Sequence, residues 1–221
     1  MKKRWAIFAA TLLTSSLLVD MAGAAEQDKP APSKSKEPVN VEVKGDLILE
    51  YYEGPSTVKL PSEKEIFKRQ GKRATAKSPQ PSIQALAYDN TDPETTGCAN
   101  NAITARSVLV KNKSGTVLST TELRYSPACR TAWGRMYVKN YQSTNYGQVV
   151  LYRLEQPYPD EAPYNCPDTW PECYHWKTDT YVSPGDSNYT NQFNDAGTLS
   201  FAHGMIRTRT GGIFEATTAS Y

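Results

Sequence analysis

The sequence predicts a mostly β protein: a single antiparallel β-sandwich or partly open barrel, stabilised by disulfides. Three observations support this prediction. Short stretches of alternating apolar and polar residues, separated by turn residues, recur along residues 82–221. Tyrosine is abundant, at 14 residues, and Thr and Val are common, which is typical of strands. Four cysteines are present in a chain whose beginning has the features of an export signal.

Residues 1–24 are predicted to be a cleavable secretory signal peptide. Three basic residues (2–4) precede a largely apolar stretch, and Ala22 and Ala24 supply the small side chains at positions −3 and −1 of a cut after residue 24. The apolar stretch would rise only about 22 Å as a helix, short of a hydrocarbon core of about 30 Å, so we expect no transmembrane anchor. The mature chain should therefore be secreted, either free or associated with the cell wall.

Removal of the signal peptide makes the chain neutral. The full sequence holds 25 Lys and Arg against 23 Asp and Glu, and residues 1–24 contain three of these bases and one of these acids, which leaves 22 of each. A neutral chain has no global attraction to nucleic acid or to an anionic membrane. We therefore expect no nucleic-acid partner, and the partner classes that remain are a cell-wall polymer and another extracellular protein.

The predicted domains are the signal peptide (1–24), a linker with a basic extension (25–81) and a β-rich core (82–221). Residues 26–38 are charged and rich in Pro and Ser, which predicts disorder. Further along the extension, residues 39–52 alternate like a strand around Gly45.

A short helix is predicted to begin near Pro61, because Ser62 and Glu65 have the spacing of a capping box. Six bases follow between residues 64 and 77, with a single acid among them. They allow three interpretations: a solvated helix face and loop, a binding site for an anionic wall polymer or lipid headgroup, or the boundary of a pro-segment that is trimmed near Arg73.

The core is predicted to consist of short strands. Residues 103–111 and 117–125 flank a turn that ends at Gly115, and residues 198–208 and 213–220 form a final hairpin. Residues 148–154 form another strand. In residues 131–139, small residues such as Gly134 occupy one face, which suits close packing against a second sheet, whereas Trp133 on the other face would cover a second core.

The four cysteines permit three disulfide pairings, of which Cys98–Cys129 with Cys166–Cys173 is favoured. The first bridge would join the beginnings of two strands across the hairpin between them. The competing hypothesis is a metal site from Cys166, Cys173 and His175. It lacks the Cys-x-x-Cys spacing of structural zinc sites, and it needs thiolates that an oxidising compartment removes. We expect neither a metal nor a cofactor.

Residues 157–181 are unusual because five prolines, which argue against regular strand or helix, alternate with aromatic side chains. These rings either form a ligand surface, as rigid aromatic side chains do at low entropic cost, or cover the open end of the β core. The candidate ligand surface consists of Tyr158, Tyr164, Trp170, Tyr174 and Trp176.

No catalytic residue is predicted. The sequence contains neither Gly-x-Ser-x-Gly nor His-Glu-x-x-His, and it has no glycine-rich phosphate loop. His203 alternates onto one strand face with Phe201 and Met205, as a half-buried structural histidine does. An extracellular hydrolase remains an alternative, with a site assembled from His203 and scattered carboxylates such as Glu122, Asp186 and Asp195.

One part of the chain resembles a known family. Residues 96–99 (TGCA) and 122–133 (ELRYSPACRTAW) resemble the signature of the domain of unknown function 2690 family, over residues 88–221. That resemblance implies a β module that is exported from Gram-positive bacteria, or, in some members, appended to helix-turn-helix regulators. It supports pairing Cys98 with Cys129 and transfers no catalytic residue. Arg124, Arg130 and Arg135 lie near the motif. Either they hold an anionic ligand, or Arg124 and Arg130 bond backbone carbonyls at the strand corner.

The leading functional hypothesis is therefore a secreted binding or interaction module of unknown ligand. The alternatives are the hydrolase and a secreted precursor that is trimmed near Arg73.

Overall fold

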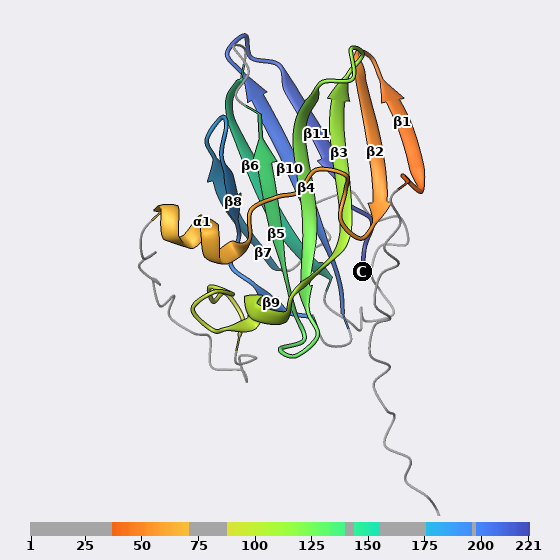
Figure 1. Ribbon diagram of the computed structural model, residues 1–221. Coiled ribbons are helices and arrows are strands. Elements are labelled where there is room, and N and C mark those ends of the chain that lie inside the picture. Colours follow the sequence, from red (N-terminus) through yellow and green to blue (C-terminus); the bar gives the residue numbers. More distant parts are fainter. Residues whose placement is uncertain (1–36, 71–87, 140–143, 155–175, 196–197) are drawn as a thin grey trace, which may run out of the picture.

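The computed structural model describes residues 37–70, 88–139, 144–154, 176–195 and 198–221, which form two packed antiparallel sheets (Figure 1). The larger sheet runs in the order β1 (Asn40–Lys44), β2 (Leu47–Glu53), β3 (Ile103–Asn112), β4 (Val117–Ser126), β5 (Thr131–Val138) and β8 (Ser187–Tyr189), and β9 (Phe193–Asn194) also pairs with β5. The smaller sheet runs β11 (Ile213–Thr217), β10 (Leu199–Thr208), β6 (Thr144–Leu154) and β7 (Trp176–Val182). The predicted β-sandwich is confirmed.

Most predicted strands lie within a few residues of their observed bounds. The exceptions fall in the second half of the chain, where β8 and β9 are too short to show a period of two. The prediction that prolines exclude regular structure throughout residues 157–181 is wrong for its last part. The final proline is Pro171, and β7 begins five residues later, at Trp176.

The larger sheet includes strands that precede residues 82–221, the predicted β-rich core. β2 pairs with β3 from Leu47 opposite Asn112 to Glu53 opposite Arg106, so residues 40–53 belong to the sandwich. Gly45, at a φ of 60°, turns β1 into β2. The hairpin gives the two strands different surroundings: Leu47 and Leu49 are buried between the sheets, whereas the side chains of β1 and its flank are exposed, by 58% at Val39, 50% at Val41 and 69% at Val43.

The two sheets approach closely where the facing residues are small. A Cβ atom added at Gly134 of β5 would lie 2.8 Å from Val149 Cγ2 of β6, a distance that real Cβ atoms do not show. Gly204 of β10 likewise has Thr121 of β4 directly against the place where a Cβ would be. The predicted small-residue face of β5 therefore packs against the second sheet.

The outer face of the larger sheet is covered by the segment that follows β2. The chain crosses the front of this sheet and ends in α1 (Glu63–Gln70), beside β8 (Figure 1). The predicted capping box is present, since the Ser62 backbone N–H donates to Glu65 Oε2 at 2.7 Å and the Glu65 N–H donates to Ser62 Oγ at 3.3 Å. Ile66 of α1 and Trp133 of β5 are both fully buried. Both belong to the same buried cluster as Leu123 and Leu151, so the predicted second core around Trp133 is not separate from the core between the sheets.

Candidate functional site

A groove lies between the two sheets, at the end where the β1–β2 and β10–β11 turns lie (top of Figure 1). Its volume is about 870 Å³. Six apolar side chains line it, from four different strands or their ends: Leu47, Leu49, Leu118, Ile206, Ile213 and Phe214. We refer to these six residues and the space between them as the apolar groove.

Charged residues stand at the rim of the apolar groove, and most are already paired. Lys44 Nζ lies 3.1 Å from Glu42 Oε2, and Lys113 Nζ lies 2.5 Å from Asp46 Oδ1. The Lys113 ammonium donates a hydrogen bond to Asp46 and attracts its charge, which lowers the pKa of that carboxyl. Lys44 and Asp46 at the rim are therefore both engaged in ion pairs within the chain.

A second feature is a buried cluster of charges between α1 and the outer face of β4 and β5. Glu63 of α1 accepts from Arg124 Nε at 2.6 Å and from Trp133 Nε1 at 3.2 Å, and Arg135 Nη1 lies 3.4 Å from the same oxygen. Arg135 also donates from Nε to Glu122 at 2.9 Å. We call Glu63, Glu122, Arg124, Trp133 and Arg135 the arginine–glutamate cluster.

The two arginines of the cluster favour the ionised form of Glu63. Burial raises the pKa of Glu63, but the charges of Arg135 and Arg124 outweigh burial, so its pKa lies below the ordinary value. A carboxyl with a lowered pKa stabilises the fold above its unfolded-state pKa, and that contribution is lost as the pH falls through the lowered value. For Arg135, burial acts in the opposite direction and lowers the pKa. The negative charges of Glu122 and Glu63 outweigh burial, so the pKa of Arg135 lies above its ordinary value.

The contacts of Arg124 and Arg135 agree in part with both interpretations of these arginines, namely binding of an anionic group and hydrogen bonding to backbone carbonyls. Arg124 Nη2 donates to the Ala102 carbonyl at 3.2 Å and Arg135 Nη1 to the Pro61 carbonyl at 2.8 Å, so both bond backbone oxygens. Both also hold anionic groups, which here are carboxylates of the same chain. Arg130 adopts a φ of 54° in the β4–β5 turn, outside the cluster.

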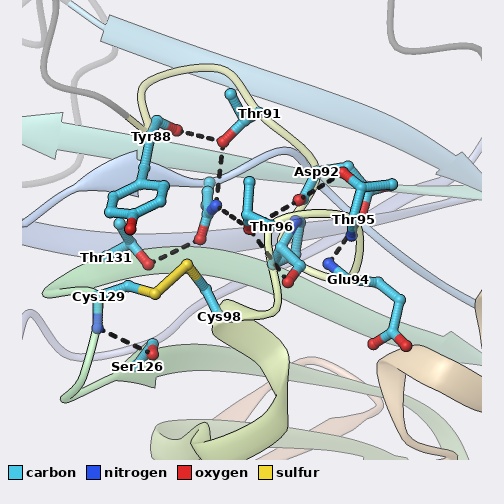
Figure 2. Close-up of a disulfide and its surroundings, with 12 residues drawn as sticks. Tyr88, Thr91, Asp92, Glu94, Thr95, Thr96, Cys98, Ser126, Cys129 and Thr131 are labelled. Atoms are coloured by element: carbon cyan, nitrogen blue, oxygen red, sulfur yellow. Dashed lines mark hydrogen bonds between the residues drawn. A yellow bond between two sulfur atoms is a disulfide. The ribbon is translucent and has the colours of Figure 1, made fainter.

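The disulfide corner lies at the opposite end of the sandwich from the apolar groove (Figure 1), and Figure 2 shows its Cys98–Cys129 bridge with the side chains around it. Cys98 begins a short 3₁₀ helix, η1 (Cys98–Asn101), and its bridge to Cys129 in the β4–β5 turn is formed, as predicted. Nearby, Gln192 is fully buried, donates to Thr96 Oγ1 at 2.8 Å and accepts from Thr131 Oγ1 at 2.7 Å. These polar groups satisfy one another, which marks this corner as structural.

His203 lies on the outward face of β10 and is half-buried. Its Nδ1 lies 2.9 Å from Thr217 Oγ1 and its Nε2 3.9 Å from Glu215. Burial lowers the pKa of His203, and Glu215 opposes this only in part. His203 is thus half-buried, as predicted, and burial favours its neutral form.

The carboxylates proposed for a hydrolase contact other partners. Glu122 binds Arg135, Asp186 accepts from Arg69 at 2.9 Å, and Asp195 accepts from Ser200 at 2.6 Å. The structure thus distributes these three acids over different places rather than around His203.

Several candidate residues lie outside the described residues. These are Ala22 and Ala24 of the signal peptide, Arg73, the cysteines Cys166 and Cys173 with His175, and the rings of Tyr158, Tyr164, Trp170 and Tyr174. Trp176 is the first residue of β7, but its side chain is also outside the described part.

Within the described ranges, no helix is long and apolar enough to cross a membrane. Among the same residues, no three His, Cys, Asp or Glu side chains are grouped as a metal site requires.

Fold and contacts together define a disulfide-linked antiparallel β-sandwich with an apolar groove at one end and a buried ionic cluster on one face. The chain belongs to the family described as proteins of unknown function DUF2690, which it matches over residues 86–198. It is also 33% identical over 60 residues to the uncharacterized protein YjfA of Bacillus subtilis (strain 168). That alignment covers 27% of this chain and 38% of the relative. No solved structure matches the chain.

Sequence reasoning missed both the apolar groove and the role of Glu63. The groove draws its wall from residues that are far apart in the chain, so no local pattern marks it. Glu63 had a weak signal: it lies three residues before Ile66, on one face of a helix whose other residues are mostly charged.

Proposed function

We propose that this chain is an exported binding module that holds an apolar chain or ring system in the apolar groove. The groove carries the proposal. Its volume of about 870 Å³ is of the size of small-molecule sites, roughly 300–1,000 Å³, and such sites are lined mainly by apolar side chains with a few polar groups. Ile213 at its mouth is 50% exposed, so apolar surface of the groove is accessible to a ligand.

The chemistry of the rim favours a ligand whose polar end stays in water. Asp46 is paired with Lys113 and Lys44 with Glu42, so the rim offers no unpaired cluster of one sign. An acyl chain with a solvated head group fits this arrangement. Export is supported by the signal-like residues 1–24 and by the Cys98–Cys129 disulfide, which suits an oxidising compartment.

Filling the apolar groove is expected to abolish ligand binding. Replacing Leu118 by Trp should weaken binding of dodecanoate at least tenfold, because the indole occupies the space that the acyl chain needs; tenfold corresponds to about 1.4 kcal/mol. The measurement is displacement of the fluorescent probe 1-anilinonaphthalene-8-sulfonate by dodecanoate. Leu199→Trp is the matched control, since Leu199 is 40% exposed and does not line the groove.

Equal affinities of the two tryptophan variants, with both folded by circular dichroism, would remove the groove from the proposal. In that case the second candidate surface is the aromatic segment 157–181. One observation favours it: Tyr181 of β7 is 62% exposed, and its ring centroid lies 5.4 Å from that of Tyr146 in an edge-to-face pair. A wall polysaccharide or another extracellular protein would then be the partner.

Export and maturation have their own test. The protein recovered from a culture supernatant is expected to begin at Ala25, and its intact mass should rise by four hydrogens on reduction, because two disulfides open. N-terminal sequencing and mass spectrometry, with and without reductant, measure both. A mature form that begins near residue 74 would support the trimmed precursor instead, and retention of residues 1–24 would contradict export by signal cleavage.

A further inference from the structure

The arginine–glutamate cluster is built from two different parts of the chain. Glu122, Arg124, Trp133 and Arg135 lie in β4 and β5, within residues 86–198 that match the family. Glu63 lies in α1, outside that match. The part that matches the family therefore supplies two guanidinium groups, one indole N–H and one carboxylate, and α1, which lies outside the match, supplies the second carboxylate.

Without Glu63, the family part would hold one uncompensated positive charge in a buried place. Arg124 is 8% exposed and Arg135 6%, and Glu122 can neutralise one of them. Leaving a buried charge unpaired is strongly unfavourable. The geometry is also that of a receptor, because donors from Arg124, Arg135 and Trp133 converge on a single oxygen, Glu63 Oε1, at 2.6–3.4 Å.

The helix that brings Glu63 has few other contacts with the sheet. α1 has eight residues, which is too few for a stable isolated helix, and its buried residues are Glu63 and Ile66. Its other contacts with β8 and the turn before it are an exposed ion pair from Arg69 to Asp186 and a 3.4 Å hydrogen bond from Gln70 Nε2 to the Ser187 carbonyl. α1 is thus held mainly by an acid and by an aliphatic side chain three residues later.

We propose that Arg124, Arg135 and Trp133 form a carboxylate-binding site on the outer face of β4 and β5, which this chain fills with its own Glu63. The ligand class is a helical peptide with the pattern Glu-x-x-Ile, and a small carboxylate occupies the same place when Glu63 is removed. The site is separate from the apolar groove, so either proposal can fail without the other.

Chemical rescue tests the site in the full-length chain. Glu63→Ala leaves the guanidinium groups and a space in which acetate can bind. At tenfold the dissociation constant, acetate should raise the Tm of Glu63→Ala by about 3–6 °C relative to sodium chloride of equal ionic strength and pH. Glu65→Ala is the matched control, because it removes an exposed carboxylate from the same helix. Acetate should leave its Tm and that of the wild type unchanged.

A synthetic peptide with the sequence of residues 56–70 provides a second readout. It should bind to full-length Glu63→Ala in a fluorescence anisotropy titration, and a peptide with Gln at the position of Glu63 should bind at least tenfold more weakly. If Glu63→Ala does not fold in chloride, the fraction that refolds in acetate replaces the Tm. Equal responses of the Glu63→Ala and Glu65→Ala proteins to acetate, together with equal binding of the two peptides, would overturn the proposal.

Discussion

Arg135→Ala is expected to lower the free energy of unfolding by about 3–5 kcal/mol, the usual effect of removing one partner of a buried ion pair. Arg135 is 6% exposed and donates to Glu122 and to the Pro61 carbonyl. Its removal leaves Glu122, which is 1% exposed, without its guanidinium partner in a place that water does not reach. Urea unfolding followed by tryptophan fluorescence measures the change.

An exposed ion pair on the same side of the molecule provides the comparison. Arg69 bonds Asp186 at 2.9 Å, a distance like those in the cluster, but the side chains of the two residues are 48% and 38% exposed. Arg69→Ala should therefore cost less than about 1 kcal/mol. The double variant Glu122→Met, Arg135→Met should lose less than the two single variants combined, because no charge is left unpaired. Similar losses for Arg69→Ala and Arg135→Ala would show that burial of the cluster does not govern its contribution.

Loss of the Cys98–Cys129 bridge should be almost as damaging. The bridge spans a sequence separation of 31 residues, and the loop-closure entropy of that length corresponds to about 3.7 kcal/mol. The variant with both cysteines replaced by Ala avoids a free thiol, and we expect its urea midpoint to fall accordingly. The same segment is also held by hydrogen bonds from Gln192 to Thr96 and from Thr131 to Gln192, so the native fold should persist.

The second predicted bridge supplies the control. Replacing Cys166 and Cys173 by Ala should lower the free energy of unfolding by about 2.5 kcal/mol, since the predicted loop has eight residues. A smaller effect for the Cys98–Cys129 pair than for this pair would contradict the loop-length argument. A change in the m-value would indicate that the variants differ in their unfolded states.

Local patterns were sufficient for most of the longer strands and for the helix start. The alternation in residues 131–138, the Gly115 turn and the spacing of Ser62 and Glu65 are all short-range features, and each is found where it was predicted. These features could be predicted from the sequence because a period of two, a positive φ and a capping box each depend on residues at most a few positions apart. β8 and β9 were missed because three and two residues are too few to establish a period.

What remained open was which distant residues meet. The residues of β1 and β2 were placed in an extension, yet β2 pairs along β3 and completes one wall of the apolar groove. Nothing local to Arg124 and Arg135 indicated whether an outside anion or backbone carbonyls would satisfy them.

The sequence by itself determined the β class, the approximate bounds of most of the longer strands and the resemblance to the family, and it favoured the pairing of Cys98 with Cys129 without determining it. Tertiary structure alone decided that Glu63 contacts Arg124 and Arg135, which lie 61 and 72 residues later in the chain, and that an apolar groove exists at all. The physical reason is that the period of a strand and the capping of a helix depend on neighbouring residues. Whether a charge or an apolar side chain is buried depends instead on the residues that pack against it, and these come from distant parts of the chain.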